Sequence, residues 1–251
     1  MEQARSGSEG AALFRDRRVA FFGGSFDPPH EGHLAIAHAA KTALQLDAVL
    51  FAPVGAQPLK PEGSSAAFGD RVAMTRLAVD GEDGFHISLL DAPRIDGAPN
   101  YTLETLVRAR TDIGPAGTLF FLMGSDSFFG LRRWHRAAEI PFAAPLIVAS
   151  RPGQPLDDLI AALPGGLALA EAQQNSGRAS EADALAGLAS YTLQNQSGAK
   201  TPLYLLTGLN FDVSASQVRE QMRARGEATD AAPAQVPAAV MAYIRAHGLY
   251  R

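Results

Sequence analysis

A strand, a glycine-rich turn, a helix and a second strand follow one another within about 40 residues near the start of the chain. Residues 18–22 (RVAFF) form a short apolar run of strand-forming side chains. Residues 34–44 repeat apolar or small side chains at helical spacing, and residues 48–54 (AVLFAPV) form the next apolar run. Two parallel strands joined by a helix make a right-handed crossover unit. The pattern therefore predicts a parallel sheet covered by helices.

The same alternation continues along the rest of the chain. Short apolar runs recur at residues 86–90, 118–124, 145–150 and 202–208, and helical patterns lie between most of them, notably at 69–79 and 101–110. About five or six strands are too few for an eightfold barrel. We therefore expect the α/β class, a Rossmann-like doubly wound parallel sheet with a small C-terminal helical part.

The expected organisation is a flexible polar leader followed by one domain. Residues 1–17 contain Gly and Ser that break any periodicity, so we expect order to begin near Arg18 and a single domain to span residues 18–251. Residues 154–200 are rich in Ala, Leu, Gln, Ser and Gly with weak patterning. We interpret this stretch as a partly helical insertion.

Composition excludes several functional classes. Of the 251 residues, 22 are Lys or Arg and 26 are Asp or Glu, a net charge of −4, so a broad basic face for nucleic acid is not expected. The chain has no cysteine, which excludes disulfides, thiolate metal sites and cysteine nucleophiles. It has no apolar run long enough to span a membrane, and its N-terminal stretch is too polar for a signal peptide. We expect a cytoplasmic protein without nucleic-acid or membrane partners.

The turn after the first strand, residues 23–33 (GGSFDPPHEGH), has the features of a phosphate site. Gly23 and Gly24 let the backbone approach a ligand, and the following helix offers its N–H groups to an anion. His30 and His33 lie three residues apart at the helix mouth, so both rings can face one polyphosphate. The turn lacks the P-loop lysine and the spaced glycines of a dinucleotide fingerprint, and HEGH is one residue short of a zinc helix. Two histidines that cap the loop structurally are the alternative interpretation.

A second candidate phosphate element is DVSASQVR, residues 212–219. Ser214 and Gln217 form a capping-box pattern, which predicts a helix start at Ser214. Ser216 would then lie in the first turn and Arg219 one turn later on the same side, where its planar fork suits phosphate. Taken alone, an ordinary capped helix with an exposed arginine is the better explanation of this pattern.

Together, the two elements resemble the HxGH nucleotidyltransferase superfamily and, within it, the bacterial nicotinate-nucleotide adenylyltransferase family. The resemblance covers residues 18–251 apart from the insertion. Three departures stand out: Ala215 and Ser216 replace the usual serine and threonine of the late motif, His135 replaces a second aromatic ring, and the insertion is long. The supporting residues are the loop 53–61 with Lys60, Asp70, Arg71, Met74, Tyr101, Thr102, Thr105, Leu106, Gly124, Asp126, Leu131, Trp134, Val240, Tyr243, Ile244, Gly248, Leu249 and Tyr250.

This resemblance implies an enzyme that joins the AMP part of ATP to nicotinic acid mononucleotide, giving nicotinic acid adenine dinucleotide and pyrophosphate. Mg²⁺ would be held mainly by substrate phosphates, with few direct protein ligands. The implied catalytic residues are His30, His33 and Arg219. The implied ATP-binding residues are Gly23, Gly24, Ser25, Phe26, Ser214 and Ser216. The implied mononucleotide-binding residues are Lys60, Thr102, Asp126 and Trp134.

Other functions stay open at this point. Pantetheine-phosphate adenylyltransferases share the signature but are typically shorter and have threonine in place of His30. A class I aminoacyl-tRNA synthetase is disfavoured by chain length, by the missing lysine-rich loop and by the acidic balance. A nucleotide-binding regulatory module without catalysis would not need both histidines and Arg219. The residues do not distinguish the acid from the amide mononucleotide, and they fit a monomer or a homo-oligomer.

Overall fold

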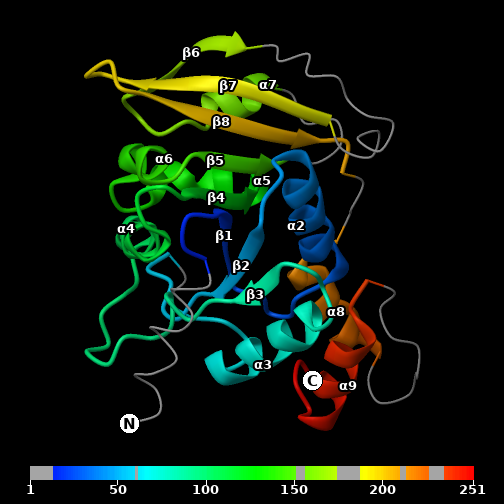
Figure 1. The fold of residues 1–251 in the computed structure, drawn as a ribbon. Helices are drawn as coiled ribbons and strands as arrows, with labels where there is room; N and C mark the ends of the chain where they lie inside the picture. Colours follow the sequence, from blue (N-terminus) through cyan, green and yellow to red (C-terminus); the bar gives the residue numbers. More distant parts are fainter. Residues whose placement is uncertain (1–13, 60–61, 151–155, 174–186, 210–212, 226–234) are drawn as a thin grey trace.

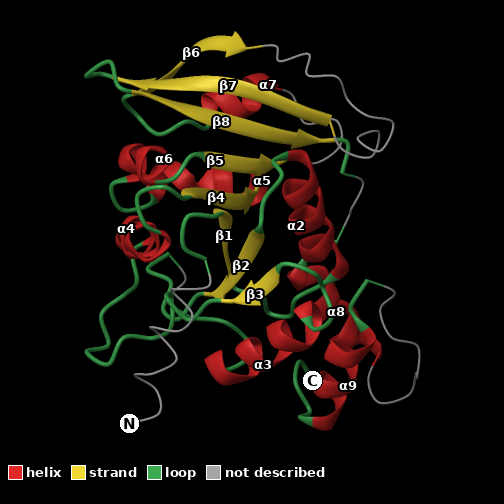
Figure 2. Ribbon diagram, in the orientation of Figure 1, coloured by secondary structure: helices red, strands yellow, loops and turns green. Residues whose placement is uncertain are grey.

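The computed structural model describes residues 14–59, 62–150, 156–173, 187–209, 213–225 and 235–251. Its centre is a twisted sheet with helices on both faces (Figures 1 and 2). Within the described residues the sheet has eight strands in the order β3-β2-β1-β4-β5-β8-β7-β6. The strands are β1 (Arg18–Gly24), β2 (Ala48–Pro53), β3 (Phe85–Ile87), β4 (Thr118–Gly124), β5 (Leu146–Ala149), β6 (Leu167–Gln173), β7 (Gly187–Asn195) and β8 (Lys200–Thr207).

The strands from β3 to β8 along this order are parallel, whereas β7 and β6 run antiparallel at one end of the sheet. The predicted doubly wound parallel sheet is therefore confirmed for six strands. The run at 86–90 forms only the three-residue strand β3, which ends at Ile87. Two more strands than expected come from the insertion.

The prediction that residues 154–200 are partly helical is right only for α7 (Leu156–Ala161), because most of the described insertion is the strand pair β6 and β7. In β7, Ala189, Tyr191 and Leu193 pack on one face of the sheet, and Ser190 and Thr192 alternate with them. This period of two is typical of an antiparallel strand with one covered face. Because Ser190 and Thr192 interrupt the apolar residues, the sequence shows no continuous apolar run that would have predicted this strand.

Two layers of helices cover the two faces of the sheet. The side chains of β1 alternate between them: Ala20 and Phe22 join one core, and Val19 and Phe21 join the other. The first core is covered by α2 (Glu31–Ala43), α3 (Phe68–Val79), α8 (Ala215–Arg225) and α9 (Ala238–Ala246). The second is covered by α4 (Thr102–Ile113), α5 (Ser125–Gly130), the short helices η1 (Leu131–Arg133), η2 (Ala137–Glu139) and α6 (Ile140–Ala143), and α7.

The expected helical parts are present. In α2, Leu34, Ala37 and Ala40 are buried and Leu44 follows them at the C-cap, which is the face that the spacing predicts. The C-terminal helical part consists of α8 and α9, next to α3 at the foot of the sheet (Figure 1). No helix among the described residues is long and apolar enough to cross a membrane.

Ordered contacts are found on the N-terminal side of the predicted boundary at Arg18. Phe14 packs its ring edge-on against His86, with centroids 5.0 Å apart, and the N–H of Asp16 donates to the carbonyl of Ile113. Residues 1–13 of the predicted leader lie outside the described part of the chain.

Candidate active site

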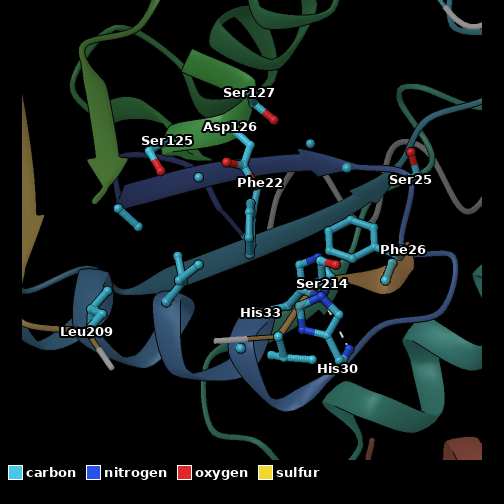
Figure 3. Close-up of a pocket in the computed structure, with 18 of the residues that line it drawn as sticks. Phe22, Ser25, Phe26, His30, His33, Ser125, Asp126, Ser127, Leu209 and Ser214 are labelled. Atoms are coloured by element: carbon cyan, nitrogen blue, oxygen red, sulfur yellow. Dashed lines mark hydrogen bonds between the residues drawn. The ribbon is translucent and has the colours of Figure 1, made fainter. Parts of the chain in front are cut away.

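The site lies where the winding of the sheet reverses. From β1 the chain builds outward to β2 and β3 on one side, and later to β4, β5 and β8 on the other. In an open parallel sheet, such a switch point leaves a crevice beyond the carboxyl ends of the two central strands. A cavity of about 240 Å³ occupies this position between the end of β1 and the end of β4. Figure 3 shows its lining, with His30, His33 and Phe26 on one side and residues 125–127 on the other.

Most of the predicted ATP-binding residues meet in this cavity. The turn after β1 and the segment that begins α8, which lie near opposite ends of the chain, share one of its walls. The lining comprises Phe22, Gly23, Gly24, Ser25, Phe26, His30, Gly32, His33, Ile36, Gly124, Ser125, Asp126, Ser127, Ala149, Ser150, Leu209, Val213, Ser214 and Ala215.

The two histidines are locked together at the mouth of α2. His30 is the N-cap residue, and its backbone N–H donates to Nδ1 of His33 over 3.2 Å. The rings stack with centroids 3.7 Å apart. Because Nδ1 of His33 accepts this bond, the proton of a neutral His33 ring must be on Nε2. His33 thus carries an N–H donor on the ring atom that the helix mouth leaves free.

Burial sets the charge state of this pair. It lowers the pKa of His30 to about 4, and it holds the pKa of His33 well below the usual 6.5, an effect to which the neighbouring His30 adds. Both rings are therefore neutral near pH 7 and act as hydrogen-bonding groups rather than as cations. The pair also forms a capping box at the start of α2, in which the His30 side chain faces the backbone N–H of His33 while the His33 side chain accepts from the backbone N–H of His30. Nδ1 of His30 is buried beside Gly32.

Gly32 is required by close packing behind the histidines. A Cβ at this position would lie 2.9 Å from Cγ1 of Val213 and 3.1 Å from Nδ1 of His30. Both distances are shorter than ordinary van der Waals contact. Glycine between the two histidines therefore lets the segment before α8 approach the helix mouth.

Asp27 organises the turn instead of facing the cavity. Its buried carboxylate accepts hydrogen bonds from the N–H groups of Ser65 (2.6 Å) and Ala66 (3.0 Å), and from the hydroxyl of Tyr250 (2.7 Å). It thus ties the phosphate turn to the loop before α3 and to the end of the chain. This is the loop-capping role that a carboxylate in a phosphate turn is expected to have.

The predicted capping box at α8 is confirmed. The N–H of Gln217 donates to Oγ of Ser214 over 3.2 Å, and the side-chain oxygen of Gln217 accepts from the N–H of Ser214 over 2.8 Å. Ser214 lines the cavity, whereas Ser216 is exposed outside the lining. Arg219 donates through Nη1 to the carbonyl of Asp27 (2.7 Å) and through Nη2 to Oγ of Ser216 (3.2 Å). The arginine therefore sits against the outer side of the phosphate turn.

The predicted mononucleotide residues are spread over several elements. Asp126 lines the cavity at the start of α5, whereas Thr102 and Trp134 are outside its lining. Thr102 is the first residue of α4, and the half-buried ring of Trp134 packs against Phe121 with centroids 6.2 Å apart. Lys60 lies outside the described residues.

Beside Thr102, the ring of His135 packs against Tyr101 with centroids 4.4 Å apart. The residue that departs from the family pattern is therefore in contact with the N-cap of α4. This contact brings the segment after Trp134 next to Thr102.

Sequence reasoning missed a buried polar cluster beneath the start of α4. Oγ1 of Thr105 donates to the carboxylate of Asp91 over 2.6 Å, and burial raises the pKa of this carboxyl group. Nδ2 of Asn100 donates to the carbonyls of Asp91 and Ala92, both at 2.7 Å. These bonds fix the loop that leads into Thr102. Thr105 was among the residues that support the family resemblance, together with Tyr101 and Thr102. No pattern in the sequence pointed to Asp91 or Asn100.

Ser125, Ser127 and Ser150 were also missed, although they line the cavity. Each follows the carboxyl end of β4 or β5. Residues at these ends face the ligand crevice of a doubly wound sheet, which is the signal that could have identified them. Among the described residues, no group of three or more His, Asp or Glu side chains is placed to hold a metal ion.

Comparisons with known proteins agree on one family. Residues 21–221 match the cytidylyltransferase-like family model. The chain is 34% identical over 233 residues to a protein of Gloeobacter violaceus named probable nicotinate-nucleotide adenylyltransferase, covering 93% of this chain and 96% of that one. It is 37% identical over 237 residues to a Stenotrophomonas maltophilia protein of the same name, covering 92% and 96%.

A solved structure shares the fold. It is the Plasmodium falciparum nicotinic acid mononucleotide adenylyltransferase complexed with NaAD, with a TM-score of 0.63 and 14% identity over 93% of this chain and 97% of that chain. At this identity the likeness concerns the fold, which supports the Rossmann-like arrangement described above.

Proposed function

Because the chain belongs to the cytidylyltransferase-like family and, within it, to the nicotinate-nucleotide adenylyltransferases, we propose that it transfers the adenylyl group of ATP to nicotinic acid mononucleotide. The products are nicotinic acid adenine dinucleotide and pyrophosphate. The enzyme is thus a nucleotidyltransferase of NAD biosynthesis. The observation that carries the proposal is the neutral, stacked His30–His33 pair in the cavity wall at the switch point of the sheet.

The reaction needs positioning and charge stabilisation from the protein. An oxygen of the mononucleotide 5′-phosphate attacks the α-phosphorus of ATP, and the bond from that phosphorus to the bridging oxygen of pyrophosphate breaks. The attacking phosphate is already ionised, so no general base is required, and no covalent intermediate with the protein forms. Zero cysteines fit this chemistry.

His33 and His30 are assigned to the transferring phosphates. In His33 the hydrogen bond from His30 to Nδ1 leaves Nε2–H as a fixed donor. A preorganised neutral donor in a buried wall stabilises charge that develops on phosphate oxygens without having to be reoriented. His30 lines the same wall and is assigned as a second polar contact to the phosphates.

The remaining ATP contacts follow from the cavity lining. Gly23, Gly24 and Ser25 bring backbone N–H groups to the ligand, Phe26 closes one wall, and Ser214 faces the cavity from the start of α8. Ser216 and Arg219 are assigned to the departing pyrophosphate. Among the described residues, Arg219 donates to the carbonyl of Asp27 and to Oγ of Ser216, and its planar fork carries five N–H donors in all, enough to add a phosphate contact.

The mononucleotide is assigned to the neighbouring loops. Asp126 lines the cavity from the start of α5, and Thr102 is the first residue of α4. Trp134 supplies a flat ring suited to stacking on pyridine, and Lys60 supplies a cation for the 5′-phosphate. Mg²⁺ would be held mainly by the substrate phosphates, where it would supply positive charge to offset theirs, a mode of binding that does not depend on a cluster of carboxylates.

We expect the enzyme to act in the cytoplasm, where ATP is abundant. The reaction requires no nucleic acid and no membrane, and either a monomer or a homo-oligomer could carry it out.

The test is pyrophosphate release from the purified chain with ATP, Mg²⁺ and one acceptor at a time. Nicotinic acid mononucleotide should give both pyrophosphate and the dinucleotide, measured by coupled assay and by chromatography. The ratio of kcat/KM for the acid and amide mononucleotides gives the substrate preference. If pyrophosphate is released only when phosphopantetheine is the acceptor, the substrate must be reassigned. If no acceptor leads to pyrophosphate release, a non-catalytic binding module is favoured.

A further inference from the structure

Tyr250 reaches the phosphate turn from the far end of the chain. Its hydroxyl donates to Oδ1 of Asp27 over 2.7 Å, and both side chains are buried. The bond joins positions 223 residues apart. Nothing in the proposed chemistry requires a tyrosine here, since Asp27 faces away from the cavity.

The Asp27 carboxylate is close to two guanidinium groups. Arg71 is 2% exposed and donates through Nη1 to the carbonyl of Ser25 over 2.8 Å. Arg219 approaches Oδ2 of Asp27 to 3.9 Å, a longer separation than a direct charged hydrogen bond. The strongest contact of Arg219 on this turn is instead the 2.7 Å bond to the backbone carbonyl of Asp27.

The position of the Arg219 guanidinium depends on how many hydrogen bonds the Asp27 carboxylate accepts from other donors. Oδ1 accepts from Tyr250 and from the N–H of Ala66, and Oδ2 accepts from the N–H of Ser65. A buried carboxylate that loses a donor will recruit the nearest available one, because an unsatisfied buried charge is costly. The candidate is the guanidinium of Arg219, which lies 3.9 Å from Oδ2 and whose side chain is one-fifth exposed, whereas Arg71 is almost fully buried.

We propose that Tyr250 is a positioning residue for Arg219: by satisfying Asp27, its hydroxyl keeps the guanidinium on the backbone carbonyl and available to the triphosphate of ATP. The inference rests on the phosphate-binding role proposed above for Arg219. Without the hydroxyl, the carboxylate draws Arg219 into a direct ion pair and away from the ligand. Tyr250 would thereby influence ATP affinity without touching ATP.

The test compares Tyr250→Phe with Tyr243→Phe. Tyr243 is a matched control, because its hydroxyl also donates to an aspartate, Oδ1 of Asp70, over 2.9 Å, but away from the turn. Calorimetric titration without acceptor should show ATP binding weakened about three- to tenfold in Tyr250→Phe, the size of one net hydrogen bond. ATP binding by Tyr243→Phe and AMP binding by both variants should match the unmodified protein, since AMP lacks the β- and γ-phosphates.

A double-mutant cycle separates positioning from general support of the fold. In an Arg219→Gln background, Tyr250→Phe should cause no further loss of ATP affinity, whereas independent structural effects would add. Unchanged ATP affinity in Tyr250→Phe, equal weakening of AMP, or full additivity in the cycle would each overturn the proposal.

Arg219→Lys tests the same geometry should Tyr250→Phe not fold. Lysine lacks the planar fork by which Arg219 bonds the Asp27 carbonyl through Nη1 and the Ser216 hydroxyl through Nη2, so ATP binding should weaken while AMP binding is kept. ATP binding equal to that of the unmodified protein would contradict the proposal. Because these titrations omit the acceptor, they remain informative if nicotinic acid mononucleotide proves not to be the substrate.

Discussion

The backbone N–H of His30 donates to Nδ1 of His33 over 3.2 Å, and the same two rings stack 3.7 Å apart. One hydrogen bond thus fixes both the ring orientation and the tautomer of His33. Since burial lowers the pKa of both groups, the pair would meet the phosphates of a bound nucleotide as neutral side chains. The two histidines also form a capping box at the start of α2, so the structural role and the proposed phosphate contact would use the same pair of side chains.

Replacement of His33 should lower turnover and leave the fold intact. His33→Ala removes the Nε2–H donor, and we expect kcat to fall by roughly 10² to 10³, the scale of losing one transition-state donor. Steady-state pyrophosphate release measures this. His38→Ala is the control on the same helix, because His38 is exposed and pairs with Glu82 outside the cavity. Turnover of His33→Ala close to that of His38→Ala would remove His33 from its proposed role.

The buried histidines should make the protein less stable in mild acid. The folded pKa of His30 is about 4 and its usual value is 6.5, so between these values the unfolded chain binds more protons than the folded one. The free energy of unfolding should therefore fall as the pH drops below about 6.5, by up to roughly 1.4 kcal/mol per pH unit for His30, and level off near pH 4. His33, whose pKa is also lowered, adds to the fall in the same direction.

Urea unfolding at about pH 5 and pH 7.5 checks this dependence. A His30→Gln variant should show a shallower slope than the unmodified protein. Identical slopes in the two proteins would mean that burial does not lower the pKa of His30 in the folded state.

The parallel part of the fold was predictable because its strands are buried on both faces. Residues 119–123 and 48–53 are apolar throughout, so their runs stand out in the sequence. In β7, by contrast, Ser190 and Thr192 interrupt Tyr191 and Leu193, and the strand was interpreted as part of a helical insertion. Its position becomes evident only when β8 provides a neighbour to pair with.

The candidate site was predictable where its residues lie together in short motifs. The turn of residues 23–33 and the capping box at Ser214 have local physical signatures. Contacts between distant parts of the chain have no such local signature. Asp27 and Tyr250, or Asp91 and Thr105, meet only because the sheet brings their loops together, and no spacing in the sequence indicates such a hydrogen bond.

Thr105 should matter for mononucleotide binding through Asp91. Thr105→Val keeps the shape of the side chain but leaves the buried Asp91 carboxyl without its 2.6 Å donor. We expect a loss of about 1 to 3 kcal/mol in unfolding free energy and a raised KM for the mononucleotide, because the loop before Thr102 loosens. Thr111→Val is the control, since Thr111 is exposed on the same helix and bonds the carbonyl of Val107. A KM for ATP that rises as much as that for the mononucleotide would place the effect elsewhere.

Gly32→Ala should impair the site by forcing apart two elements that converge on it. The added Cβ would meet Cγ1 of Val213 at 2.9 Å and Nδ1 of His30 at 3.1 Å, so either the segment before α8 or the His30 ring must move. Overpacking of this kind costs about 1 to 3 kcal/mol. Movement of His30 or Ser214 should also lower kcat and raise the KM for ATP.

Gly69→Ala isolates this steric effect from the general consequences of replacing glycine. Gly69 lies in α3, and a Cβ there has no atom within 4 Å. Alanine at an exposed helix position should stabilise the protein by up to about 1 kcal/mol and leave activity unchanged. If packing at Gly32 matters, Gly32→Ala should lower both the unfolding temperature and the activity, whereas Gly69→Ala should raise the unfolding temperature and leave the activity unchanged. Thermal unfolding and steady-state kinetics measure the two effects. If the two variants have the same stability and activity, the start of α2 and the segment before α8 can move apart without cost, and the close contact with Val213 is not required.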